Sequence, residues 1–279
     1  MNAIEVNGLY KKIKNFELRN VTFSVEQGTV AGFIGQNGAG KSTTIKLLLN
    51  FMKKTRGEVL LFGLDHVAHE VAVKGDIGVV FDELHLPDSL TLIEIEKFYA
   101  KVYARWDKEQ FFAYCTRFNI DKYAKIKTLS RGTKMKLALV LALSHKPKLL
   151  LLDEPTSGLD PVVRDEILDE LLEFMQDETH TIFFSSHITS DLEKIADTIT
   201  CIHQGEILFS ENKDTLLYEY GIWKGKSEEA LAIPDDAILG KRRNSFGIEL
   251  LVKKNKVSHV FELEQPTIED IMIFVVRGV

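Results

Sequence analysis

The segment Gly35-Gln36-Asn37-Gly38-Ala39-Gly40-Lys41-Ser42-Thr43 carries the strongest structural signal in the chain. The apolar run from Thr29 to Ile34 precedes it and predicts a buried strand. The residues after it, Thr44 to Leu49, predict a helix. A strand, a glycine-rich loop and a helix therefore follow one another along the chain.

This segment matches the pattern G-x-x-x-x-G-K-[ST]. In that pattern, glycine N–H groups surround phosphate oxygens, the lysine meets the β/γ charge, and the hydroxyl binds Mg²⁺. A glycine-rich surface turn is the alternative interpretation, but a chain of this length matches by chance only about once in a hundred cases. The following helix would direct its positive N-terminal end at the anion. We therefore predict phosphate binding by this loop.

Downstream, the apolar run Leu149 to Leu152 ends in two adjacent carboxylates, Asp153 and Glu154. Side chains alternate along a strand, so these two point in opposite directions. We predict that Asp153 binds Mg²⁺ together with Ser42. Glu154 is predicted to accept a proton from an attacking water. Acids that end a strand for solubility are the alternative interpretation, which the phosphate loop upstream disfavours.

Alternating strands and helices predict an α/β fold around a largely parallel sheet. Strands are expected at Lys148–Asp153 and Thr181–Ser186, with a helix between them from about residue 163 to 177. Residues 82–145 are expected to form an inserted helical subdomain, because Thr91 with Glu94 forms a capping box and Asp107 opens a second helix.

The two ends of the chain predict separate features. Residues 20–25 alternate and are followed by a Gln27-Gly28 turn, which predicts a hairpin with the strand at 29–34. We expect a phosphate-binding domain over residues 1–221 and a small α+β extension over 222–279. In the extension, residues 246–254 and 256–264 predict two strands joined tightly at Asn255, and Thr267 predicts the cap of a terminal helix.

Composition narrows the class of protein. The 279 residues are 45% hydrophobic and 27% charged, which is typical of a globular domain. The longest apolar stretches are far shorter than the roughly 20 residues that span a bilayer, and the N-terminus shows no secretory signal, so we expect a cytosolic chain. The net charge of −6 disfavours broad nucleic-acid binding. Cys115 and Cys201 have no partners at zinc-ligand spacing.

Three further motifs carry a family resemblance. They are Leu129-Ser130-Arg131-Gly132-Thr133, Ser157-Gly158-Leu159-Asp160 and Ser186-His187. In this order after the phosphate loop, they resemble the signature, D-loop and switch of the ATP-binding-cassette (ABC) ATPases, over about residues 1–220. The resemblance implies a P-loop NTPase of the ABC ATPase type, with an antiparallel β subdomain and an inserted helical subdomain.

The resemblance also implies roles for individual residues. Ser130 is expected to cap the helix that follows it, and in the family Ser130 and Gly132 would contact the γ-phosphate of ATP bound by a second protomer, so that two ATP molecules join a head-to-tail dimer. An ordinary cap and turn is the alternative interpretation of this segment. Asp160 would act across the same interface, or it would simply begin a helix before Pro161. His187 would contact the γ-phosphate and orient water, or it would be a polar strand terminus.

Three positions depart from the family pattern. Asp82 stands in the Q-loop, Val79-Val80-Phe81-Asp82-Glu83, where glutamine is usual, and either binds Mg²⁺ or is a solvated loop acid. Arg131 replaces the first glycine of the signature, where it either assists phosphate binding or slows closure. The position expected to stack on adenine falls near Ile13, between Tyr10 and Phe16.

The resemblance predicts a MgATP-dependent ATPase that forms a homodimer or heterodimer and powers transport through a separate membrane-spanning partner. The chain would then lie on the cytoplasmic face of the membrane. The pattern that includes Asp82, Arg131 and the segment 266–271 resembles exporters of antimicrobial peptides or other amphipathic compounds. Tyr103 or Trp106 is expected to help dock the partner. The alternatives are an ATP-dependent regulatory switch with weak hydrolysis and a soluble ABC protein of ribosomes or DNA repair.

Overall fold

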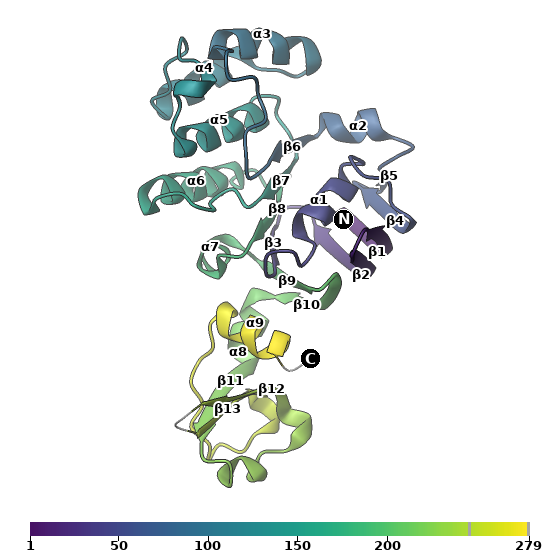
Figure 1. The fold of residues 1–279 in the computed structure, drawn as a ribbon, viewed down its shortest axis with the longest axis vertical. Coiled ribbons are helices and arrows are strands. Elements are labelled where there is room, and N and C mark those ends of the chain that lie inside the picture. Colours follow the sequence, from purple (N-terminus) through teal and green to yellow (C-terminus); the bar gives the residue numbers. More distant parts are fainter. Residues whose placement is uncertain (245–246, 278–279) are drawn as a thin grey trace.

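The computed structural model describes residues 1–244 and 247–277 (Figure 1). The α-helices of these residues are α1 (Lys41–Leu48), α2 (Glu70–Gly75), α3 (Leu92–Val102), α4 (Lys108–Arg117), α5 (Arg131–Leu143), α6 (Pro161–Phe174), α7 (Thr189–Ile195), α8 (Lys213–Glu219) and α9 (Ile268–Arg277). Short 3-10 helices are η1 (Ile126–Thr128), η2 (Glu229–Ala232), η3 (Asp235–Ala237) and η4 (Lys254–Lys256). The strands belong to three sheets.

The central sheet has six strands in the order β10-β9-β3-β8-β7-β6. The strands are β3 (Val30–Ile34), β6 (Ile77–Val80), β7 (Leu149–Asp153), β8 (Thr181–Ser186), β9 (Thr198–His203) and β10 (Glu206–Asn212). All pairs except β9–β10 are parallel. Every residue of β3, β7 and β8 is buried, as expected for parallel strands covered on both faces. The predicted α/β fold with a largely parallel sheet is confirmed.

An antiparallel sheet of order β2-β1-β4-β5 packs beside the central sheet. Its strands are β1 (Asn2–Ile13), β2 (Phe16–Glu26), β4 (Arg56–Leu61) and β5 (Leu64–Asp65). The predicted hairpin between residues 20–25 and 29–34 is wrong, because β2 pairs with β1 while β3 enters the central sheet. The burial pattern explains the separation: β2 alternates between buried and exposed positions, whereas β3 is buried throughout.

Helices α3, α4 and α5 gather at one end of the molecule (Figure 1). The caps predicted at Thr91 and Asp107 are present, and Thr91 and Glu94 form the full capping box. Helix α5 joins this helical subdomain to the central sheet, because its two faces pack in two different hydrophobic cores. Met135 and Leu139 pack in the sheet's core, and Leu137 and Val140 pack among α3 and α4. Helix α5 is therefore shared between the two cores.

The C-terminal part lies at the opposite end (Figure 1). Its sheet has the order β11-β13-β12, with strands β11 (Tyr220–Gly225), β12 (Ile238–Asn244) and β13 (Gly247–Lys253). Helix α9 packs with the core of the central sheet, and the cap predicted at Thr267 is present. The strand predicted at 256–264 is wrong, since β13 is already paired on both edges and only an isolated bridge joins Glu264 to Ile222. Phe246 of the other predicted strand lies outside the described residues.

Candidate nucleotide-binding site

Parallel strands bring distant segments together at one edge of the central sheet. Strand β8 lies between β3 and β7, and all three run in the same direction. The glycine-rich loop follows β3, Glu154 follows β7, and His187 follows β8. The carboxyl ends of parallel strands share an edge, so this order places the three predicted motifs side by side.

The glycine-rich loop turns directly into α1. Gly38 and Gly40 have φ values of +81° and +120°, a region that favours glycine. A Cβ atom at Gly40 would also lie 2.7 Å from Leu18 Cδ2. Helix α1 begins at Lys41, and no side chain accepts a hydrogen bond at its N-cap. Its first N–H groups therefore suit an anion.

Lys41, Glu154 and His187 form one cluster at this edge. The Lys41 side chain is 5% exposed, and its Nζ donates to the Gly35 carbonyl at 2.6 Å. The same Nζ lies 3.0 Å from Glu154 Oε1. His187 Nδ1 lies 2.6 Å from Glu154 Oε2, and the nitrogen is the donor because a carboxylate only accepts. The Glu154 carboxylate is thus fixed by groups from two other segments.

The backbone at Glu154 is strained. Its φ is +54°, in the left-handed region that residues with a side chain rarely adopt. Such strain persists only where the surrounding contacts enforce it, and it often marks a functional position. The conformation turns the chain sharply after Asp153, and the sequence contains no glycine or asparagine that would have predicted it.

Asp153 is buried behind the loop, with 2% of its surface exposed. Ser185 Oγ donates to Asp153 Oδ1 at 2.8 Å. Burial raises the pKa of the Asp153 carboxyl, and the negative charges of Asp82 and Glu154 add to that effect, while the hydroxyls of Ser185 and Ser42 oppose it. A cation would relieve this accumulation of carboxylates. The hydroxyl and carboxylate oxygens fit Mg²⁺, which prefers oxygen ligands.

Lys41, Glu154 and His187 line a cavity of about 610 Å³, a size typical of small-molecule sites. It is lined by Ile13, Phe16, Asn37, Gly38, Gly40, Lys41, Ser42, Thr43, Asp82, Arg131, Glu154, Ser157 and His187. The apolar end comes from Ile13 and Phe16. Tyr10 instead carries the Arg56 guanidinium over its ring, 4.5 Å from the centroid. Of Tyr10 and Phe16, Phe16 is thus the aromatic residue that lines this cavity.

Other predicted residues lie elsewhere in the described structure and do not line this cavity. Ser130 accepts a hydrogen bond from the Thr133 N–H and caps α5. Gly132 packs against Val163, since a Cβ atom there would lie 3.1 Å from Val163 Cγ1. Asp160 accepts hydrogen bonds from the first N–H groups of α6 at 3.1 Å. The cap predicted at Ser130 is confirmed, and the roles of these residues towards a second protomer stay predictions.

Two residues of the site were not predicted as site residues from the sequence. Ser185 lies opposite Asp153 in the register of β7 and β8, and it was a polar residue within an apolar run. Ser157 lines the cavity, although it was noted only as part of the D-loop. A search for polar residues at the ends of the predicted strands would have found Ser185.

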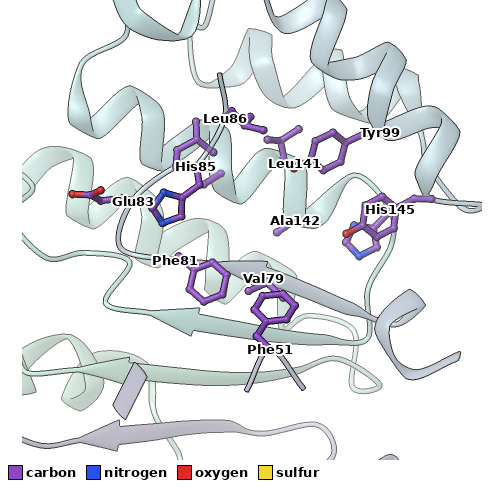
Figure 2. A pocket seen from close by; sticks show the side chains of 13 residues that line it. Phe51, Val79, Phe81, Glu83, His85, Leu86, Tyr99, Leu141, Ala142 and His145 are labelled. Carbon is purple, nitrogen blue, oxygen red and sulfur yellow. The ribbon is translucent and has the colours of Figure 1, made fainter. Parts of the chain in front are cut away.

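A second cavity, of about 270 Å³, lies between the sheet and the helical subdomain (Figure 2). Figure 2 shows Phe51, Val79 and Phe81 on one side and Leu86, Leu141 and Tyr99 on the other. The remaining lining residues are Glu83, Leu84, His85, Tyr103, Ala138, Ala142 and His145. The cavity therefore combines aromatic walls with a few polar groups.

The two aromatic residues predicted for docking differ in position. The Tyr103 ring stacks on His145, with 4.1 Å between the centroids, and lines the second cavity. Trp106 packs instead against Tyr99 and Phe111, with centroid distances of 5.3 and 5.4 Å. Trp106 is therefore half-buried against the helical subdomain's core, and the docking role of Tyr103 or Trp106 stays a prediction.

The loop, the clustered carboxylates and the parallel sheet define a P-loop nucleotide-binding protein. The sequence profile of the family described as ABC transporter matches residues 18–157. The chain belongs to the ABC transporter family, and the predicted class of ATP-binding ATPase is confirmed.

Individual relatives agree with this assignment. An ABC transporter ATP-binding protein of Mycoplasma pneumoniae is 36% identical over 216 residues, which span 74% of this chain and 66% of that protein, slightly less than two thirds. The bacitracin transport ATP-binding protein BcrA of Bacillus licheniformis is 32% identical over 222 residues, spanning 75% and 68%. A solved ATP-binding subunit of an ABC transporter superimposes with a TM-score of 0.70 at 26% identity, covering 77% of this chain and 91% of that one.

No helix among the described residues has the length and apolar character needed to span a membrane.

Proposed function

We propose that this chain binds MgATP in the 610 Å³ cavity and hydrolyses it to power a separate membrane-spanning partner. The observation that carries the proposal is the position of Glu154, held between Lys41 and His187 beside the glycine-rich loop. A carboxylate fixed at the phosphate end of the cavity is placed to accept a proton from an attacking water. One chain thus supplies the cavity, the proton acceptor Glu154 and the cation Lys41.

Each group at the phosphate end has a distinct proposed role. The Lys41 ammonium has three N–H donors, so it can keep the Gly35 carbonyl and donate to β- and γ-phosphate oxygens as well. His187 orients Glu154 and the water, and the loop N–H groups hold the phosphates. Ser42 and Asp153 would bind Mg²⁺, with Asp82 as a further ligand. The metal would neutralise the charge that develops on the phosphates.

Ser130, Gly132 and Asp160 are proposed to complete the ATP site of a second protomer. They do not line the chain's own cavity, and they lie at the starts of α5 and α6. A helix start attracts negative charge. We therefore propose a dimer, either of two identical chains or with a second ABC ATPase subunit, closed by two ATP molecules.

The second cavity is the proposed docking site for the membrane-spanning partner on its cytoplasmic face. Its occupant would be a short amphipathic helix, because the walls are aromatic while Glu83 and His85 supply polar contacts at one side (Figure 2). Phe81 and Glu83, on either side of Asp82, both line this cavity, so a docked helix would contact the same loop that reaches the nucleotide cavity. Similarity to the bacitracin transport protein supports export of an antimicrobial peptide or another amphipathic compound.

A turnover experiment tests the ATPase proposal. We expect Glu154→Gln to lose steady-state hydrolysis while keeping MgATP binding, and to accumulate a dimer in size-exclusion chromatography with ATP and Mg²⁺. The matched control is Glu178→Gln, which removes the charge of an exposed glutamate and should leave turnover unchanged. Normal turnover in Glu154→Gln would disprove the assignment of the base. Very low turnover in the unaltered protein, with tight ATP binding, would favour the regulatory switch instead.

A further inference from the structure

One cation of the nucleotide cavity comes from the helical subdomain rather than from the glycine-rich loop. Arg131 is the first residue of α5 and lines the cavity together with Lys41, Glu154 and His187. Its neighbours Ser130 and Gly132 do not line this cavity in the described chain. The signature segment therefore directs one side chain, the arginine, towards the nucleotide site of its own chain.

The position of the guanidinium is set by the loop after β7. Arg131 Nη2 donates to the Ser157 carbonyl at 2.8 Å. Gly158 has a φ of +67°, and a Cβ atom there would lie 2.7 Å from Arg131 Nη1 and 2.9 Å from Arg131 Cζ. A side chain at position 158 would crowd the guanidinium in this position. The packing of Gly132 against Val163 fixes the backbone from which Arg131 extends.

The charges around Arg131 fit a phosphate ligand. The cavity wall also carries the carboxylates Asp82 and Glu154, while Lys41 is already paired with Glu154. A polyphosphate that entered would meet these carboxylates unless a second cation offset them. The guanidinium has five N–H donors in a planar fork that matches phosphate oxygens, and the Ser157 carbonyl accepts one of them. Donors thus remain for a ligand.

We propose that Arg131 binds the terminal phosphate of the ATP held by its own chain and so distinguishes ATP from ADP. The inference rests on the proposed function, because it requires ATP in the 610 Å³ cavity. It also explains the two departures at this site: the negative charge of Asp82 and the positive charge of Arg131 face one cavity and offset each other. ATP would then connect the glycine-rich loop, the loop after β7 and the start of α5 within one protomer.

Nucleotide binding by the monomer tests the proposal. The affinities of MgADP and of the non-hydrolysable MgAMPPNP are measured by calorimetry, at a concentration where light scattering shows a monomer. We expect Arg131→Met to weaken MgAMPPNP binding by about 10-fold and MgADP binding by less than about 2-fold, since a charge-assisted hydrogen bond is lost only from the terminal phosphate. Arg131→Lys should recover part of the difference.

Lys134→Met is the matched control, because Lys134 lies on α5 beside the adjoining cavity and not in the nucleotide cavity. It should leave both affinities unchanged. An unchanged AMPPNP-to-ADP ratio in Arg131→Met would overturn the inference while leaving the proposed function intact. Failure of the unaltered protein to bind either nucleotide would instead overturn the proposed function.

A mixed dimer distinguishes action on the chain's own ATP from action on the partner's. One chain carries Lys41→Ala and cannot hold nucleotide, and the other keeps Lys41. Arg131→Met on the chain that keeps Lys41 should weaken AMPPNP binding, and the same change on the Lys41→Ala chain should have no effect. The opposite pattern would show that Arg131 acts across the dimer and would refute the inference.

Discussion

Replacing Ser185 by alanine removes the hydroxyl that donates to Asp153 Oδ1 at 2.8 Å, deep behind the glycine-rich loop. The pKa of Asp153 is already raised, first by burial and then by the nearby charges of Asp82 and Glu154. The Ser185 and Ser42 hydroxyls lower it. Without Ser185, the carboxyl retains its proton to higher pH, and the proton competes more effectively with Mg²⁺.

The size of the effect follows from the bond that is lost. A hydrogen bond to a charged group contributes about 1.5–3 kcal/mol. That energy corresponds to about 10- to 100-fold in an equilibrium constant. We therefore expect Ser185→Ala to raise the Mg²⁺ concentration for half-maximal ATPase activity by at least about 10-fold on the acidic side of the pH profile. The difference from the unaltered protein should shrink as pH rises and Asp153 ionises in both.

Stability gives an independent measurement with a definite sign. The folded-state pKa of Asp153 lies above its unfolded value, so its favourable contribution is present below the unfolded pKa and is lost as pH rises through the folded pKa. Ser185→Ala raises the folded pKa further. In the presence of a chelator, urea unfolding should show the variant less stable than the unaltered protein at neutral pH, with a smaller difference in acid.

The assay is ATPase activity titrated with Mg²⁺ at several pH values between about 5.5 and 8.5, a range that brackets neutral pH. The control is Ser144→Ala, which removes another buried hydroxyl, bonded to the Val140 carbonyl at 2.6 Å and far along α5 from the site. The reasoning is refuted if Ser185→Ala needs no more Mg²⁺ than the control, or if its requirement changes by the same factor at every pH.

Three further outcomes are expected. Lys41→Ala should abolish MgATP binding and turnover, because it removes the cation at the phosphate end of the cavity. Lys46→Ala, on the exposed side of α1, should leave both unchanged. Equal ATPase activity of the two variants would contradict the assignment of the phosphate loop. Asp82→Asn should change the Mg²⁺ dependence of hydrolysis more than nucleotide affinity, and superimposable Mg²⁺ titrations would mark Asp82 as a solvated acid. Tyr103→Asp should weaken capture of the membrane subunit in a pull-down while ATP binding is retained. Val102→Asp, at a position that is 58% exposed, is the control for an added charge on α3. Full capture by Tyr103→Asp would show that the docking site lies elsewhere.

Local signals in the sequence predicted much of the fold. Strands β3, β7 and β8 appear as apolar runs because both of their faces are covered. The caps of α3, α4 and α5 were predicted because a cap depends on residues only three positions apart. The wrong predictions, a hairpin into β3 and a strand at 256–264, concerned which strand pairs with which. Pairing depends on edges that distant parts of the chain occupy.

The sequence by itself determined the chemistry of the site: a phosphate loop, a carboxylate pair and a histidine, each at the end of an apolar strand. It did not determine that these groups touch. The order β3-β8-β7 differs from the order along the chain, and it alone brings Lys41 and His187 onto the two oxygens of Glu154. Likewise, the position of Arg131 at its own chain's cavity follows from the packing of α5 between two cores and from the room that Gly158 leaves. Such contacts depend on long-range packing, which motif spacing does not encode.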